Sequence, residues 1–145
     1  MAVHLDACDD FVMPHQEADL RTLVAEQAAL NRVAVTVATE TAAERVFDVV
    51  TEEVARLLGA DAANLVRFGP IPDEAVIVGK WSEPGVQIPG AGTIVKTEDG
   101  GALSRVARTG SPARQATDEP GVPAELHARL VELGVTSLVA APIVV

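Results

Sequence analysis

The feature that most constrains the fold is the C-terminal stretch, residues 123–145, where a short helical pattern runs straight into an apolar segment. Pro123 suits the first turn of a helix, because an N–H at that position has no intrahelical partner. Three leucines then repeat at helical spacing, and Gly134 follows where a helix commonly ends. Residues 135–145 predict a buried β-strand. Because a domain rarely ends on its most apolar strand, we expect the domain to be incomplete.

Composition limits the class of protein. The chain has 145 residues, enough for one domain, and 48% apolar but only 3% aromatic residues, so that Val, Leu and Ala must build the core. A net charge of −10 without a basic stripe argues against nucleic acid and against an anionic membrane surface as partners. The single cysteine, Cys8, excludes an internal disulfide. With no span-length apolar run and no secretory signal, we expect a cytoplasmic protein.

The N-terminal part predicts a leader and one long helix. Residues 1–15 are acidic and broken by Pro14, and we expect them to be disordered. Residues 16–40 carry a stripe of positions alternately three and four apart, as in a coiled coil, namely Leu20, Leu23, Gln27, Leu30, Ala34 and Val37. Two interpretations remain open. Either this stripe packs on its own domain, or its apolar members join two protomers in a signalling homodimer.

The rest of the chain predicts helices and strands that do not strictly alternate. Helices are expected at residues 41–58, 102–109 and 123–133. Strands are expected at residues 62–68, 75–81, 93–97 and 135–145. The intervening stretches 82–92 and 111–122 are rich in turn residues and predict irregular loops. This order favours an α+β fold in which helices pack on an antiparallel sheet.

Four segments carry a family resemblance. They are EQAALNRVAVTVATETAAERVFDVVTEEVARLLGADAANLVRF (26–68), VGKWSEPG (78–85), ALSRVARTGSPAR (102–114) and ARLVELGVTSLVAAPIVV (128–145). In order and spacing they resemble a GAF domain, and more narrowly the GAF domains of actinobacterial sensor histidine kinases. The resemblance implies a GAF/PAS-like antiparallel sheet at residues 41–145, preceded by the long helix, and a signalling role without a specified ligand.

The resemblance also bears on the C-terminus. In a GAF domain the segment matching APIVV is followed by a turn, a central strand and a helix that leads to the output domain. We therefore expect that a C-terminal strand and helix are missing here, and that the parent protein carries a histidine kinase.

Motifs for catalysis or metal binding are missing from the sequence. It holds no GxGxxG, P-loop or GxSxG motif. The three histidines, His4, His15 and His127, lack metal-ligand spacing. A methionine sulfoxide reductase, an activity found among related folds, would need reactive cysteines, and Cys8 lies before the domain. We expect neither enzymatic activity nor a bound metal.

Five residues are candidate ligand contacts. Alternation along a strand puts Gly79 and Trp81 on one face, where Gly79 would leave space and Trp81 would either pack in the core or stack on a ligand. Arg105 and Arg114 either reach an anionic ligand or lie solvated at the surface. His127 flanks the leucine stripe of the last helix and is either an ordinary helix histidine or, as in some GAF domains, a haem ligand.

The sequence thus favours a regulatory module. A small ligand or a partner domain would bind beneath residues 82–118 and bias the N-terminal helix and an output domain. One alternative is a dimerisation scaffold with a filled, ligand-free core. A remote alternative is a haem-binding redox or gas sensor that uses His127. The sequence identifies neither the ligand nor a cofactor.

Overall fold

The computed structural model describes residues 2–3, 15–40, 42–97 and 100–143. Within these ranges the helices are α1 (His15–Thr39), α2 (Ala43–Leu58), α3 (Ala102–Thr109) and α4 (Ala124–Glu132). The strands are β1 (Ala2–Val3), β2 (Ala62–Phe68), β3 (Glu74–Ser82), β4 (Ile94–Lys96), β5 (Ala113–Ala116) and β6 (Ser137–Ala140). All of the described strands form one antiparallel sheet in the order β4-β3-β2-β1-β6-β5. The predicted α+β class is confirmed.

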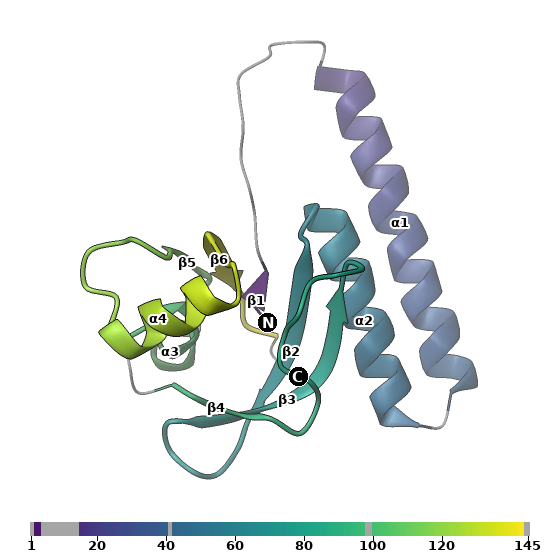
Figure 1. Ribbon diagram of the computed structural model, residues 1–145. Helices are drawn as coiled ribbons and strands as arrows, with labels where there is room; N and C mark the ends of the chain where they lie inside the picture. Colours follow the sequence, from purple (N-terminus) through teal and green to yellow (C-terminus); the bar gives the residue numbers. More distant parts are fainter. Residues whose placement is uncertain (1, 4–14, 41, 98–99, 144–145) are drawn as a thin grey trace.

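The helices lie in two groups around this sheet. Helix α2 packs on β2 and β3, and α1 packs in turn on α2, on the side away from the sheet (Figure 1). Helices α3 and α4 lie on the other side of β2 and β3, and α3 contacts β5 and β6 (Figure 1). The sheet is therefore covered tightly on one face by α2 and more loosely on the other by the short helices.

Glycines follow helices α2 and α4, and the one after α4 is the Gly134 that the sequence predicts. Gly59 follows α2 with φ 61°, and Gly134 follows α4 with φ 70°. In this left-handed conformation the chain turns back, so that the N–H of Ala60 donates to the carbonyl of Ala55 at 2.9 Å. Because L side chains rarely adopt this conformation, glycine at these positions sets where each helix stops.

Strand β5 was not predicted. Residues 111–122 were expected to be an irregular loop, yet Ala113–Ala116 pair with Ser137–Ala140 in antiparallel register. The sequence of β5, ARQA, contains no β-branched or aromatic residue, so strand propensity could not reveal it. The last strand is also shorter than the predicted 135–145. The presence of β5 and the length of β6 both depend on which other strands supply backbone hydrogen-bond partners.

Strand β1 occupies an unexpected place near the middle of the sheet. Ala2 pairs with Asn64 of β2 on one side and with Ala140 of β6 on the other. We had expected no fixed structure for residues 1–15, of which residues 1 and 4–14 lie outside the described ranges. This pairing joins backbone groups, so the acidic composition of residues 1–15 could not predict that β1 forms. The expected absence of a further C-terminal strand and helix stays a prediction.

Helix α1 turns small residues, not its leucines, towards α2. Ala29 is 3% exposed, and Val33 is half-buried. The predicted stripe lies elsewhere on the helix and is exposed at every position, with Leu20, Leu23, Leu30 and Val37 at 61%, 59%, 64% and 57%. The interpretation that this stripe packs on its own domain is therefore wrong. Pairing of two protomers through it stays a prediction.

Small residues let α2 approach the sheet closely. Buried Ala55, Ala60 and Ala63 form a cluster on which Trp81 packs. A Cβ atom at Gly79 would lie 2.7 Å from the Thr51 hydroxyl oxygen and 2.8 Å from a backbone carbonyl oxygen of α2. The space that the sequence analysis expected beside Gly79 is thus filled by α2.

One ion pair fixes α1 to α2. Arg32 donates to both carboxylate oxygens of Glu53, from Nε at 2.5 Å and from Nη2 at 2.6 Å. The Glu53 side chain is 6% exposed and that of Arg32 is 54% exposed. These hydrogen bonds from Arg32 lower the pKa of the Glu53 carboxyl below its ordinary value, and they outweigh the opposing effect of burial. An ion pair between Glu52 and Arg56 lies on the surface of α2, with Nη2 of Arg56 at 2.6 Å from Oε1 of Glu52.

Replacing Gly79 with alanine tests the contact between α2 and β3. We expect Gly79→Ala to lower the free energy of unfolding by about 1–3 kcal/mol, because backbone atoms of α2 have no room to move away. Urea denaturation measures this change. The matched control is Gly90→Ala, whose added Cβ would have its nearest neighbour at 4.0 Å, and we expect a change below about 1 kcal/mol. Equal effects of the two substitutions would contradict the close packing.

The pH dependence of stability tests the Arg32–Glu53 ion pair. Because the pKa of Glu53 is lower in the folded than in the unfolded chain, its contribution is complete above its ordinary value of 4.5 and disappears as the pH falls through the folded value. We expect Glu53→Gln to destabilise the protein most near neutral pH and least in acid, as measured by urea denaturation at several pH values. The control Glu52→Gln removes an exposed pair and should cost little. A difference independent of pH would contradict this account.

Candidate functional site

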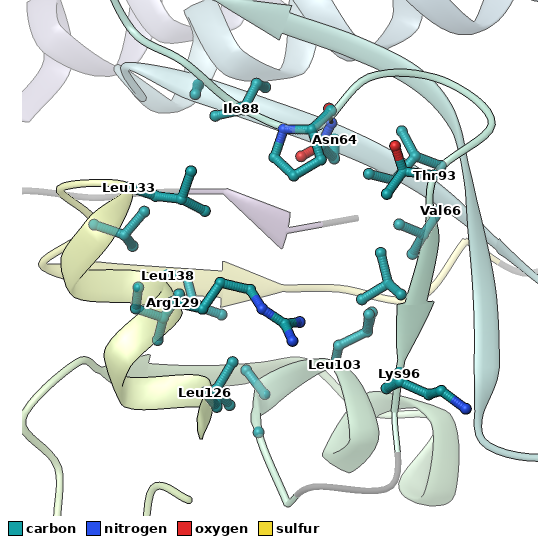
Figure 2. Close-up of a pocket in the computed structure, with 18 of the residues that line it drawn as sticks. Asn64, Val66, Ile88, Thr93, Lys96, Leu103, Leu126, Arg129, Leu133 and Leu138 are labelled. Atoms are coloured by element: carbon teal, nitrogen blue, oxygen red, sulfur yellow. Dashed lines mark hydrogen bonds between the residues drawn. The ribbon is translucent and has the colours of Figure 1, made fainter. Parts of the chain in front are cut away.

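The candidate site is a cavity of about 450 Å³ between the sheet and the two short helices (Figure 2). Its wall is contributed by β2, β3 and β4 on one side and by α3, α4, β5 and β6 on the other. The wall is mostly aliphatic, and the aliphatic members labelled in Figure 2 are Val66, Ile88, Leu103, Leu126, Leu133 and Leu138. A largely apolar cavity of this size is typical of sites that bind a small molecule.

Local periodicity explains how these elements supply the wall. Asn64 and Val66 are two residues apart on β2, so both side chains point to the face of the sheet opposite α2. On α4 the predicted leucine stripe runs along the helix side that closes the cavity, and Leu130 is its buried member. Arg129 lies between these leucines on the same side. An amphipathic helix thus presents one cation within an apolar surface.

Gln115 is the buried polar group of the site. Its side chain is 2% exposed, and its Oε1 accepts a hydrogen bond of 2.5 Å from the backbone N–H of Ala102 at the start of α3. Because this bond occupies Oε1, it determines the orientation of the amide, and Nε2 is the donor on its other side. Nε2 has no hydrogen-bond partner within the described part of the chain. A buried donor without a partner costs about 1–3 kcal/mol, so that an acceptor in the cavity would be stabilised there.

Two cations reach the cavity, and their situations differ. The ammonium of Lys96 lies 3.2 Å from a carboxylate oxygen of Glu74, so its charge is already balanced. Arg129 is exposed and extends from α4 into the space in front of Leu103 (Figure 2). Its side chain makes neither an ion pair nor a hydrogen bond with the residues that the structure describes. The described wall holds no Asp or Glu, so that Arg129 carries the one charge of this wall that no carboxylate of the described residues balances.

Comparison with known proteins identifies the domain. The family model for the GAF domain matches residues 42–145, which is most of the chain. The chain belongs to the GAF family. No curated protein matches this GAF domain.

Two solved structures have the same fold as this GAF domain. One is the phycocyanobilin-bound GAF domain from a cyanobacterial phytochrome, with a TM-score of 0.63 and 20% identity over 81% of this chain and 72% of that one. The other is the phycoerythrobilin-bound GAF domain from a cyanobacterial phytochrome, with a TM-score of 0.63 and 19% identity over 81% and 73%. At these identities the likeness concerns the fold alone.

The structure places the five predicted contact residues of this GAF domain outside the cavity wall. Trp81 and Gly79 face α2, on the opposite side of the sheet. Arg105 and Arg114 do come together, because Arg105 Nη2 donates to the Arg114 carbonyl at 2.6 Å, and Arg105 also lies 3.6 Å from Glu119. His127 is exposed on α4. Their role as ligand contacts stays a prediction that the cavity does not support.

Sequence reasoning missed the polar residues that do line the cavity. Arg129 had a usable signal, since it stands three residues after Leu126 and four before Leu133 and therefore shares their side of the helix. Gln115 had none, because its burial depends on β5 pairing with β6. Asn64 is held by the loop before β4, where its Nδ2 donates to the carbonyl of Pro89 at 3.2 Å.

The described residues offer no place for a protein-bound metal. Among them, no three His, Cys, Asp or Glu side chains gather closely enough to hold an ion. Neither histidine nor cysteine occurs in the cavity wall within the described ranges. Of the helices that the structure describes, none combines the length and apolar character that a membrane span requires.

Proposed function

We propose that this chain is the small-ligand-sensing GAF module of a two-component signalling protein, with a parent resembling an actinobacterial sensor histidine kinase. The observation that carries the sensing role is the aliphatic cavity of about 450 Å³, which contains an unpartnered amide donor and a cation. The described wall holds no nucleophile paired with a base, and the proposed role is binding without catalysis. The kinase context rests on the resemblance of the segments named above and on the long helix α1.

A path for the signal follows from the packing. Asn64 and Val66 of β2 line the cavity on one face of the sheet, while Ala63 of the same strand is buried in the cluster with Ala55 of α2. Helix α2 packs on that strand, and the Arg32–Glu53 pair joins α2 to α1. A ligand that binds two arrangements of the sheet with different affinity would shift the position of α1. In this proposal α1 is the element that transmits the state of the cavity.

A ligand screen tests the sensing role. We expect at least one compound from a panel of cyclic nucleotides, haem and small metabolites to stabilise the chain saturably in a thermal-shift assay. At a ligand concentration of one hundred times Kd the gain is about 2.7 kcal/mol, or roughly 5–10 °C in Tm. Leu133→Trp, which fills the cavity, should abolish the shift. Val131→Trp lies on the same helix but is exposed outside the wall, and it should preserve the shift.

A second candidate function is a dimerisation scaffold with no ligand. The observation that favours it is the stripe of α1, in which Leu20, Leu23, Leu30 and Val37 are exposed. Two such helices in parallel would cover each other's leucines, and Gln27 within the stripe would help to set their register. A dimer can also sense a ligand. If no compound in the ligand screen stabilises the chain, only the function as a dimerisation scaffold remains.

Charge substitutions in the stripe test dimerisation. We expect the unmodified chain to be a dimer and the double variant Leu23→Asp with Leu30→Asp to be a monomer, because carboxylates at the seam repel one another and lose water. Light scattering coupled to size exclusion measures both. The control Ile71→Asp places the same charge at an apolar residue that is 59% exposed outside α1. A monomeric unmodified chain, or a dimer that survives the double substitution, would contradict the coiled-coil interface.

A further inference from the structure

The wall of the cavity defines the chemistry of its ligand more narrowly than the family does. We propose that the cavity binds an aliphatic oxyanion, either a carboxylate or a phosphate monoester. Its charged group is held by Arg129. Its apolar body carries a second, uncharged oxygen that accepts a hydrogen bond from Gln115. The proposal rests on the sensing role proposed above and adds the class of ligand.

Arg129 supplies the site for the charge. The chain has a net charge of −10, yet the described wall contains two cations and no carboxylate. Lys96 is balanced by Glu74. Glu125 and Glu132 stand four residues before and three after Arg129 on the chain, but neither forms an ion pair with it in the described structure. A planar guanidinium with free N–H donors in an apolar wall selects an oxyanion.

Gln115 supplies a second, independent requirement. Gln115 is 2% exposed and belongs to the cavity wall, and its Nε2 has no hydrogen-bond partner in the described part of the chain. Because Oε1 is occupied by the N–H of Ala102, the amide cannot turn over to offer an acceptor instead. Nε2 can therefore only donate. A purely aliphatic tail would leave this donor unsatisfied, whereas a carbonyl or hydroxyl oxygen would satisfy it.

The positions of these groups order the ligand. Arg129 is exposed and so lies at the mouth, whereas Gln115 is a buried member of the wall. The wall also includes aliphatic side chains such as Val66, Leu103 and Leu138 (Figure 2). The described wall includes no aromatic side chain on which a planar ring could stack. The charged end of the ligand therefore faces solvent, and the second oxygen is carried by a non-aromatic body inside.

Binding of simple amphiphiles tests the charge requirement. Calorimetry and thermal shift would compare hexanoate, decanoate and decyl phosphate with decanol and decyltrimethylammonium, all below their aggregation concentrations. We expect at least one of the anions to bind about tenfold or more tightly than the neutral and cationic probes. Arg129→Gln should remove that preference. The matched control Arg108→Gln removes the same charge from the last turn of α3, outside the wall, and should retain it.

A second pair of probes tests the buried donor. We expect 10-hydroxydecanoate to bind about tenfold more tightly than decanoate, since its terminal hydroxyl accepts from Nε2. Gln115→Met keeps the length of the side chain but removes the donor, and it should abolish this preference. Circular dichroism would verify that the variant folds. If it does not fold, the hydroxyl preference of the unmodified chain and the Arg129→Gln result still decide the matter.

Several outcomes would overturn the inference without touching the sensing role. The inference fails if decanol or the cationic probe equals the anions in affinity, if Arg129→Gln binds the anions unchanged, or if a cyclic nucleotide binds while every aliphatic anion fails. In each case the cavity still binds a ligand, but of another class. If no compound of either panel stabilises the chain, the proposed sensing function itself fails.

Discussion

The close approach of α2 to β3 is the contact on which the rest of the structure depends. It is possible because Gly79 has no side chain and because Ala55 and Ala63 are small, so that helix and sheet meet with little between them. This contact covers one face of β2 and β3. The opposite face presents Asn64 and Val66 of β2 and, beyond a shift in register between the strands, Ile77 of β3, and there the short helices α3 and α4 leave a cavity. The cavity is thus a consequence of tight packing elsewhere.

The polar groups of the cavity follow from two different kinds of order. Arg129 reaches it because helical spacing places this residue within a leucine stripe, a local property of the chain. Gln115 reaches it because β5 pairs with β6 and brings the side chain against the start of α3, where it accepts from Ala102. An apolar space with a cation at its mouth and an unpaired donor inside has the chemistry of a receptor for an amphipathic anion.

Helix α1 connects this site to the outside of the molecule. It is joined to α2 by small residues and by the Arg32–Glu53 pair, and it leaves its larger apolar side chains exposed. Periodicity predicted the helix and the stripe, but it could not distinguish between packing on the domain and packing on a second protomer. The described structure excludes the first, since α2 contacts a different side of α1. Periodicity was limited in the same way for Trp81. Strand alternation placed Trp81 and Gly79 on one face, but it could not predict that α2 packs on that face.

By itself the sequence determined the helices, most strand positions, the glycines that end α2 and α4, and the family, because these depend on local spacing and on segment order. The tertiary structure alone decided that Ala2–Val3 pair between β2 and β6, that residues 113–116 form a strand, and that Gln115 rather than Trp81 faces the cavity. The physical reason is that strand pairing joins backbone groups that are far apart in the chain. The side-chain pattern within one segment does not predict which distant strand will pair with it.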